Sequence, residues 1–299
     1  MNQPHPAARP RVVVAGANSQ TGRLLLLLLR DSGMHATALV RQPARLVADE
    51  VISDWTNNPH SAEAIAAADA VVLLTGVVGA DHWAAYEHGM VDTARQVAQA
   101  VGARDTRVVY FSSLLADAGS ENWYLRAKGM AEDVLRVLPG SVIFRLGPVV
   151  RGSPQPLPFE QALLQQAPDA PVVLYGEHAE QRTTRPINLG DVATIAESAA
   201  LGMGKAGIYE LAGPEEHSLA QLARLANGGD VAVRSAPLQT LACPVLQHSV
   251  RDLLARIAAP RDAGAPAATA AAFGLRLTPL SLAWPLDAPE PQGTQEAAS

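Results

Sequence analysis

The sequence VVVAGANSQTGRL at residues 12–24 decides how the chain folds. It opens with β-branched residues, which favour a buried strand of a parallel sheet, and it leads into the apolar run 24–29, which favours a helix. Gly16 lets the chain turn sharply as it leaves the strand, and Gly22 lets the helix pack closely on the sheet. The stretch therefore predicts a strand, a tight turn and a helix whose first N–H groups are free to bind an anion.

This arrangement is typical of sites where the pyrophosphate of a dinucleotide lies at a helix N-terminus. The usual fingerprint has a third glycine between the other two, and Ser19 and Gln20 fill the candidate positions here. A serine is small enough to approach a phosphate and can donate a hydrogen bond to it. A tight turn of an α/β protein that binds nothing is the alternative interpretation. The residues expected to bind a cofactor at this loop are Gly16, Asn18, Ser19, Gln20, Thr21 and Gly22.

Composition narrows the class of protein. The 299 residues allow one large α/β domain with an elaborated end, or two modest domains. An aromatic content of 4% and a net charge of −6 do not suggest binding to nucleic acid or to an anionic membrane. The single cysteine, Cys243, cannot form a disulfide within the chain or a cysteine-based zinc site, which favours the reducing cytoplasm. Residues 1–10 contain no apolar signal core, and the run 24–29 is far shorter than the roughly 20 residues of a membrane span.

Apolar runs and helical stretches alternate along the first half of the chain, which predicts a parallel sheet with right-handed crossovers. Six strands are expected, and their arrangement fits a doubly wound Rossmann sheet of order 3-2-1-4-5-6. The strands are predicted at residues 11–15, 35–40, 50–53, 70–75, 107–112 and 141–146, and the helices at 21–31, 61–67, 82–101 and 123–138.

Beyond Gly147 the pattern changes, because several prolines interrupt regular structure. We expect a helix at 159–166, strands at 172–175 and 207–211, and helices capped by Asp191 and Ser218. The domain organisation that follows is a tail at 1–10, a nucleotide-binding domain at 11–150, a small α+β substrate lobe at 151–286 interleaved with it, and a disordered tail at 287–299.

A second signal is the sequence YLRAK at residues 124–128, on the helix expected after the strand 107–112. Tyr124 and Lys128 lie four positions apart and so share one face of that helix. A nearby ammonium favours the phenolate and lowers the pKa of the phenol, which lets the tyrosine act as general acid when a hydride reaches a carbonyl carbon. A serine at the end of the strand, Ser112 or Ser113, can hold the carbonyl oxygen. The alternative is a surface lysine one turn from a half-buried tyrosine.

The chain resembles the short-chain dehydrogenase/reductase superfamily, in its atypical or extended branch, and is similar there to NmrA-like and NAD-dependent epimerase-like proteins. The motifs that carry the resemblance occur in order over residues 11–225. They are the loop from Gly16 to Gly22, Asp54, Thr75-Gly76, Phe111-Ser112-Ser113, Tyr124 to Lys128 with Ala131-Glu132, FRLGP at 144–148, RPI at 185–187 with DVA at 191–193, and YELAG at 209–213.

The resemblance implies a role for each matching position. Ser113, Tyr124 and Lys128 would be the catalytic residues, and Lys128 would also bind the nicotinamide ribose. Asp54 would contact the adenine, while Thr75 and Gly76 would line the cofactor cleft. Ser112 and Gly147 complete the expected cofactor-binding set.

Arg41 decides which cofactor we expect. Chains that bind NAD usually place an acid at the end of the second strand, where it accepts hydrogen bonds from the ribose 2′-OH. Here Val40 is followed by Arg41, and a guanidinium suits a 2′-phosphate. We therefore expect NADP rather than NAD, with a solvated arginine in a loop as the alternative. No metal is expected, because His82 and His88 have no convergent partners in the sequence.

Together these patterns predict an NADP(H)-dependent oxidoreductase that transfers a hydride to or from a small carbonyl or alcohol. Two alternatives stay open: a sugar-nucleotide epimerase or dehydratase that uses a tightly held cofactor, and a non-enzymatic NmrA-like cofactor sensor or assembly protein. The expected partner is a small-molecule substrate, with a homodimer left open and neither nucleic acid nor membrane expected. Arg182 and Arg185 would border the substrate pocket by resemblance, where each could bind a substrate anion or form a structural ion pair.

Overall fold

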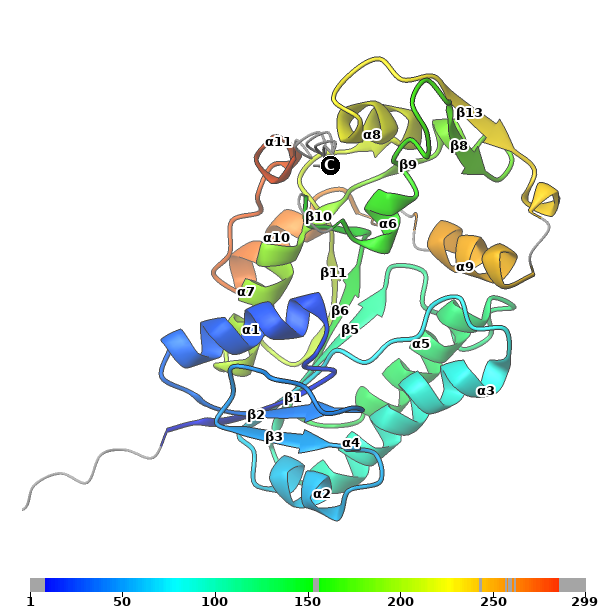
Figure 1. Cartoon of the computed structure of the whole chain (residues 1–299). Helices are drawn as coiled ribbons and strands as arrows, with labels where there is room; N and C mark the ends of the chain where they lie inside the picture. The colour runs from blue at the N-terminus through cyan, green and yellow to red at the C-terminus, as the bar shows by residue number, and fades with distance from the viewer. Residues whose placement is uncertain are drawn as a thin grey trace, which may run out of the picture.

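The computed structural model describes residues 9–152, 156–241, 244–255, 257, 260 and 262–284. In these residues a twisted parallel sheet with helices on both faces carries a smaller lobe at one end (Figure 1). The tail predicted at 287–299 and all but the last two residues of the tail predicted at 1–10 lie outside the described residues.

The main sheet confirms the predicted fold class. Its order is β3-β2-β1-β4-β5-β6-β11, and every neighbouring pair is parallel. The six expected strands take the predicted order, and β11 adds a seventh beside β6. The strand order reverses beside β1, which places the carboxyl end of this strand at the point where such sheets bind ligands. The strands are β1 (Arg11–Ala15), β2 (His35–Val40), β3 (Glu50–Ser53), β4 (Ala70–Leu73), β5 (Arg107–Ser113), β6 (Ser141–Leu146) and β11 (Gly207–Leu211).

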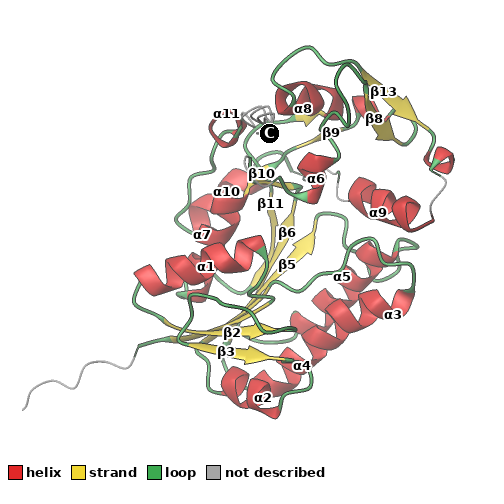
Figure 2. Cartoon of the chain, in the orientation of Figure 1, coloured by secondary structure: helices red, strands yellow, loops and turns green. Residues whose placement is uncertain are grey.

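Two hydrophobic cores flank the sheet, because successive strand residues point to opposite faces. Val12 and Val14 of β1 belong to a core with helices α1 (Gln20–Asp31) and α7 (Leu189–Ala200), and with Phe273 at the C-cap of α10 (Ala265–Ala272). Val13 and Ala15 pack with α2 (Pro59–Ala66), α4 (Thr93–Val101) and α5 (Trp123–Leu135) on the other face (Figure 2). The fully buried strands explain why their sequences are continuous apolar runs.

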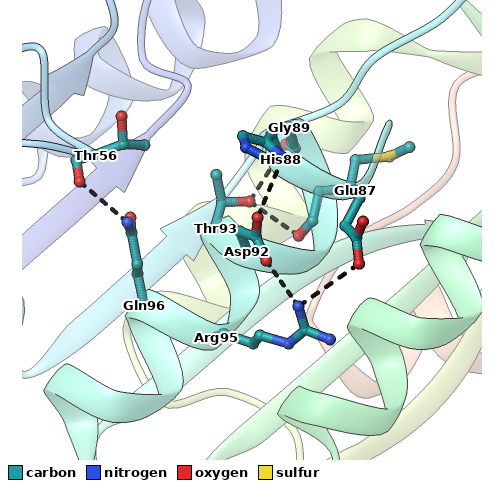
Figure 3. A network of polar contacts seen from close by, with 9 residues as sticks. Thr56, Glu87, His88, Gly89, Asp92, Thr93, Arg95 and Gln96 are labelled. Carbon is teal, nitrogen blue, oxygen red and sulfur yellow. Dashed lines mark hydrogen bonds and ion pairs between the residues drawn. The ribbon is translucent and has the colours of Figure 1, made fainter. Parts of the chain in front are cut away.

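The helix predicted at 82–101 is three segments rather than one. A short helix α3 (Trp83–Tyr86) is followed by the π-helical turn η1 (Glu87–Asp92) and then by α4. Figure 3 shows the polar contacts around this turn, where Arg95 Nη1 lies 2.7 Å from Asp92 Oδ1 and the Thr93 hydroxyl donates to the Met90 carbonyl at 2.9 Å. π-turns inside helices often mark functional sites.

The smaller lobe has its own core, which includes Phe159, Leu222 and Trp284. Its strands β8 (Val172–Tyr175) and β13 (Val233–Ala236) pair in parallel. Two short pairs connect it to the sheet: β7 (Val149–Val150) with β10 (Ile187–Asn188), and β9 (Thr183–Thr184) with β12 (His217–Ser218). Its helices are α6 (Pro158–Gln161), α8 (Leu219–Ala226), α9 (Pro244–Ala255) and α11 (Leu280–Ala283), with 3₁₀ turns η2 (Ala179–Gln181) and η3 (Leu238–Thr240). Helix α6 ends at Gln161 and is thus shorter than the predicted 159–166.

Asp191 does not cap α7, contrary to the prediction. The N-cap is Asn188, whose side-chain oxygen accepts a hydrogen bond from the Gly190 N–H. Asp191 lies within the first turn, where its buried carboxylate accepts hydrogen bonds from the backbone N–H and the hydroxyl of Thr278, both at 2.7 Å. The acid therefore fastens the C-terminal segment to α7. The cap predicted at Ser218 is present, since Ser218 accepts from the Gln221 N–H at 3.2 Å.

Candidate cofactor cleft and active site

A cleft of about 830 Å³ opens at the carboxyl ends of β1, β2 and β4. Its volume lies in the range of about 300–1,000 Å³ that is usual for ligand sites. The loops after these strands and the segment α3–η1 form its walls. The residues that line it are Gly16, Asn18, Ser19, Val40, Arg41, Gln42, Trp55, Thr56, Leu74, Thr75, Gly76, Val77, Ala85, His88, Gly89 and Thr93.

The loop after β1 requires both of its glycines. Gly16 has φ +79°, and a Cβ there would lie 3.0 Å from the backbone of Leu74. A Cβ at Gly22 would lie 2.6 Å from the Ala17 carbonyl oxygen. Ser19 caps α1, because its hydroxyl oxygen accepts from the Gly22 N–H at 3.0 Å and its own proton stays available to a ligand. With no acid in the first turn of α1, the positive end of the helix dipole faces the cleft unneutralised.

Two arginines hold the polar side chains of this loop. Arg23 Nη2 donates to Asn18 Oδ1 at 2.5 Å, and Arg151 Nη1 donates to Gln20 Oε1 at 2.7 Å. Both guanidinium groups therefore stand near the N-terminus of α1, where an anionic ligand is favoured. Of the predicted loop residues, Gly16, Asn18 and Ser19 line the cleft, whereas Gln20, Thr21 and Gly22 do not.

The end of the cleft beside β2 is formed by Arg41 together with Val40 and Gln42. Arg41 is exposed, so its guanidinium lies at the rim. Asp54, the expected adenine contact, does not line the cleft. Its side chain accepts from Asn57 Nδ2 at 2.9 Å, and its backbone has φ +49°. The two residues that follow it, Trp55 and Thr56, form the wall instead.

The Tyr124–Lys128 pair lies in the first two turns of α5. The helix starts there because Asn122 caps it, accepting from the Leu125 N–H at 3.0 Å. Lys128 is 5% exposed, and its ammonium donates to the Phe111 carbonyl at 2.7 Å. Lys128 Nζ lies 4.8 Å from the centroid of the Tyr110 ring and 6.0 Å from that of Tyr124. The ammonium thus stands within electrostatic reach of two phenol rings.

Lys128 lies close to the cleft wall at Gly76. A Cβ at Gly76, which lines the cleft, would lie 4.0 Å from Lys128 Nζ. Tyr124 is 6% exposed and packs in a buried cluster with Tyr86, Met90 and Val91. Neither Tyr124 nor Ser113 lines the cleft itself. The structure therefore places Lys128 directly behind the cleft wall at Gly76, with the Tyr124 ring centroid 6.0 Å from its ammonium.

The phenol of Tyr110 is fully buried beside the Lys128 ammonium. Complete burial raises the pKa of Tyr110 well above its ordinary value, and interactions with Tyr124 and Glu132 raise it further. Tyr110 consequently stays neutral and offers its ring to Lys128.

The two other predicted positions near this site have different surroundings. Ser112 is buried, and within the described part of the chain its hydroxyl has no hydrogen-bond partner. Gly147 donates its N–H to the Leu211 carbonyl at 3.0 Å, and a Cβ there would lie 2.9 Å from the Arg185 carbonyl oxygen. Close backbone packing between β6, β11 and the segment before β10 accounts for a glycine at this position.

The π-turn η1 and the first residue of α4 supply two cleft residues that the sequence did not indicate. Gly89 and Thr93 line the cleft, and the Thr93 hydroxyl lies 2.9 Å from that of Thr75. A Cβ at Gly89 would overlap the Val77 side chain, so the glycine allows the turn to approach the loop after β4. His88 also lines the cleft from its rim, with 79% of its side chain exposed and Asp92 at 3.4 Å.

Arg182 and Arg185 make contacts within the smaller lobe. Arg182 Nη2 donates to the Ile257 carbonyl at 3.3 Å, and Arg185 pairs with Glu216 at 3.4 Å and donates to the Ala263 carbonyl at 3.1 Å. These contacts support the structural interpretation of both arginines.

Among the residues that the structure describes, no group of three or more His, Cys, Asp or Glu side chains is placed to hold a metal ion. The helices described are all too short or too polar to cross a membrane.

The sequence is similar to proteins that bind or use NAD(P)H, in agreement with the cleft described above. Residues 16–138, which contain the glycine loop, the cleft walls and the Tyr124–Lys128 pair, match the NAD(P)H-binding family. A ceramide reductase from Caulobacter vibrioides (strain NA1000 / CB15N) is 27% identical over 151 residues, which cover 48% of each protein. The match thus spans about half the length of that curated relative.

Solved structures share the fold over most of this chain. The enzyme WbmH from Bordetella bronchiseptica, in complex with NAD+, superposes with a TM-score of 0.68 at 16% identity, covering 92% of this chain and 95% of that one. The human epimerase family protein SDR39U1 (isoform 2), with NADPH, gives 0.62 at 19% identity and covers 90% and 95%. The family match and the shared fold agree with the predicted resemblance to the short-chain dehydrogenase/reductase superfamily.

Proposed function

We propose that this chain binds NADP(H) and is an oxidoreductase that acts on a small carbonyl or alcohol substrate. The observation that carries the proposal is the position of the Lys128 ammonium, which is buried 6.0 Å from the Tyr124 ring centroid and borders the cleft at Gly76. A buried cation beside a tyrosine, next to a cofactor cleft, is the arrangement that acid–base chemistry at a carbonyl needs.

The cleft fits a dinucleotide. The N-terminus of α1 would hold the pyrophosphate with Gly16, Asn18 and Ser19, while Arg41 at the rim would hold a 2′-phosphate. Lys128 would hold the nicotinamide ribose. When bound, the nicotinamide supplies or accepts the hydride.

The residues of the chain move the proton. In the direction of reduction, Tyr124 Oη donates its proton to the carbonyl oxygen of the substrate as that oxygen gains negative charge. Lys128 favours the phenolate that remains, and Ser113 orients the oxygen by a hydrogen bond. In the reverse direction the phenolate accepts the proton of the alcohol.

The relative named as a ceramide reductase supports reduction over epimerisation. It also supports the inclusion of ceramide-type lipids among the substrates tested. The smaller lobe has an apolar cavity of about 40 Å³ between α6, α8 and α9, lined by side chains such as Phe159, Leu163 and Leu253.

The proposal is tested by the oxidation of NADPH with ketones, aldehydes, quinones, enones and ceramide-type lipids. Tyr124→Phe should lower kcat by about 10²- to 10⁴-fold, because it removes the only proton that the proposal gives to the substrate. The dissociation constant of NADPH, measured by fluorescence, should change by less than about twofold. Unchanged turnover in Tyr124→Phe contradicts the proposal. Co-purified cofactor without net turnover of added NADPH would instead support the epimerase alternative.

A further inference from the structure

Helix α9 of the smaller lobe lies against the Tyr124 end of the nucleotide-binding domain, beside α5 (Figures 1 and 2), and contacts Tyr86 of α3. Its two faces differ in character. Leu253 and Leu254 pack into the core of the lobe. His248, Ser249 and Asp252 contact the nucleotide-binding domain instead. The helix therefore joins the two parts of the molecule next to the proposed catalytic residues.

Asp252 makes the strongest contacts across this junction. Its carboxylate is 3% exposed and accepts hydrogen bonds from three separate segments. Oδ2 accepts from the Tyr86 hydroxyl at 2.5 Å and from the Gly79 N–H at 2.9 Å, while Oδ1 accepts from Asn122 Nδ2 at 3.4 Å. A buried carboxylate is stable only with such donors, so its place depends on α9 being docked.

Two neighbouring contacts make this docking specific. The His248 and Trp123 rings stack with their centroids 5.2 Å apart and their planes 8° from parallel. Gly79 has φ +73°, and the Ser249 side chain occupies the space that a Cβ at Gly79 would need. The loop after β4 is therefore shaped to receive α9.

The partners of Asp252 flank Tyr124 on two sides. Asn122 is the N-cap of α5, whose first turn carries Tyr124. Tyr86 packs with Tyr124 in one buried cluster and meets Trp123 edge-on at 6.0 Å. Burial and the Asp252 carboxylate raise the pKa of Tyr86, so its hydroxyl keeps the proton that it donates.

We propose that α9 forms the substrate-side wall of the active site beside Tyr124, and that Asp252 is the positioning residue that holds this wall in place. The inference rests on the proposed function, because the substrate is the carbonyl compound that Tyr124 protonates. Asp252 itself touches neither the cofactor cleft nor the reacting atoms. Its loss should weaken substrate binding and leave cofactor binding intact, since the cleft lining does not include α9.

The first arm of the test compares kinetic constants. Asp252→Ala should raise KM for the most active carbonyl of the panel by at least about tenfold, with kcat within about threefold and the NADPH dissociation constant within about twofold. Tyr86→Phe, which keeps the ring and removes one donor, should raise KM less. Asp230→Asn, at an exposed carboxylate of the same lobe, is the matched control and should change none of these constants. A KM within about twofold of wild type in Asp252→Ala overturns the proposal, whatever happens to kcat.

The second arm needs no activity. Amide hydrogen exchange, read by mass spectrometry, should become at least about tenfold faster in segments 77–82 and 122–128 of Asp252→Ala, with strand 11–15 unchanged. Unchanged exchange in both segments overturns the docking role of Asp252. If no carbonyl of the panel supports NADPH oxidation by the wild type, the proposed function fails, and this arm still decides whether Asp252 holds α9 against α5.

Discussion

Arg41 is predicted to set the preference for NADPH over NADH, and the two cofactors provide a matched pair for testing it. They differ only in the 2′-phosphate, so a contact to that group changes one dissociation constant and spares the other. Arg41 lies at the exposed rim of the cleft. A hydrogen bond to a charged group contributes about 1.5–3 kcal/mol, and solvent screening at the rim reduces this to about 1–2 kcal/mol. That range corresponds to a loss of roughly 5- to 30-fold.

The assay is titration of the protein with NADPH and with NADH, followed by cofactor fluorescence. Arg41→Gln should weaken NADPH binding by that factor and leave NADH binding unchanged. Raising the salt concentration should reduce the difference between the cofactors in the wild type but not in the variant. Arg45→Gln removes an exposed arginine from the same loop and serves as the control. Equal weakening of both cofactors, or tighter binding of NADH by the wild type, would show that Arg41 does not recognise a 2′-phosphate.

Three further predictions concern other parts of the structure. Gly16→Ala should destabilise the fold by at least about 1 kcal/mol and abolish NADPH binding, because φ is +79° and a Cβ would lie 3.0 Å from the Leu74 backbone. Urea unfolding measures the loss of stability and titration measures the loss of binding, and normal NADPH binding would contradict the need for a glycine at this turn. Glu160→Gln should lower the free energy of unfolding by about 2–3 kcal/mol, because the buried carboxylate accepts hydrogen bonds from Gly152, Leu157 and the Trp284 indole. Glu177→Gln, at an exposed glutamate, is the control, and equal stability of the two variants would refute the role of these hydrogen bonds. Folding raises the pKa of Tyr110, so the free energy of unfolding is unaffected by this group below the unfolded pKa near 10 and falls above it, by about 1.4 kcal/mol per pH unit. Tyr110→Phe should therefore flatten the fall in the free energy of unfolding between about pH 10 and 11.5, and an unaltered slope would exclude this role.

The sheet could be predicted from the sequence because its central strands β1, β4 and β5 are buried on both faces. The runs at 35–40 and 141–146 are mostly apolar, and they form β2 and β6 with the predicted bounds. The π-turn was missed because Met90, Ala94 and Val97 keep the apolar spacing of a helix on both sides of it. Residue type alone favours Asp191 as the cap of α7, whereas the structure uses that carboxylate to bind Thr278.

The site was predictable where local sequence sets the geometry. Gly16, Asn18, Ser19, Thr75 and Gly76 all line the cleft, and their binding of a cofactor stays a prediction. The contact between Asp252 and Tyr86 joins residues far apart in the sequence, and neither residue lies in a motif. Such contacts depend on how the lobe docks, which the pattern of apolar residues does not encode.

The smaller lobe begins after β6, but α7 and β11 then return to the main sheet. This order limits where the chain can be cut into separate domains. A fragment ending at Val150 would retain six strands but would lose β11, which covers the outer edge of β6, and α7, which packs beside α1. The edge of β6 would then be open to pairing with other chains, and Leu25, Leu29 and Phe144 would be partly uncovered. Expression of residues 11–150 alone should therefore yield aggregates, and a circular permutation that keeps 189–211 offers a better route to an isolated nucleotide-binding unit.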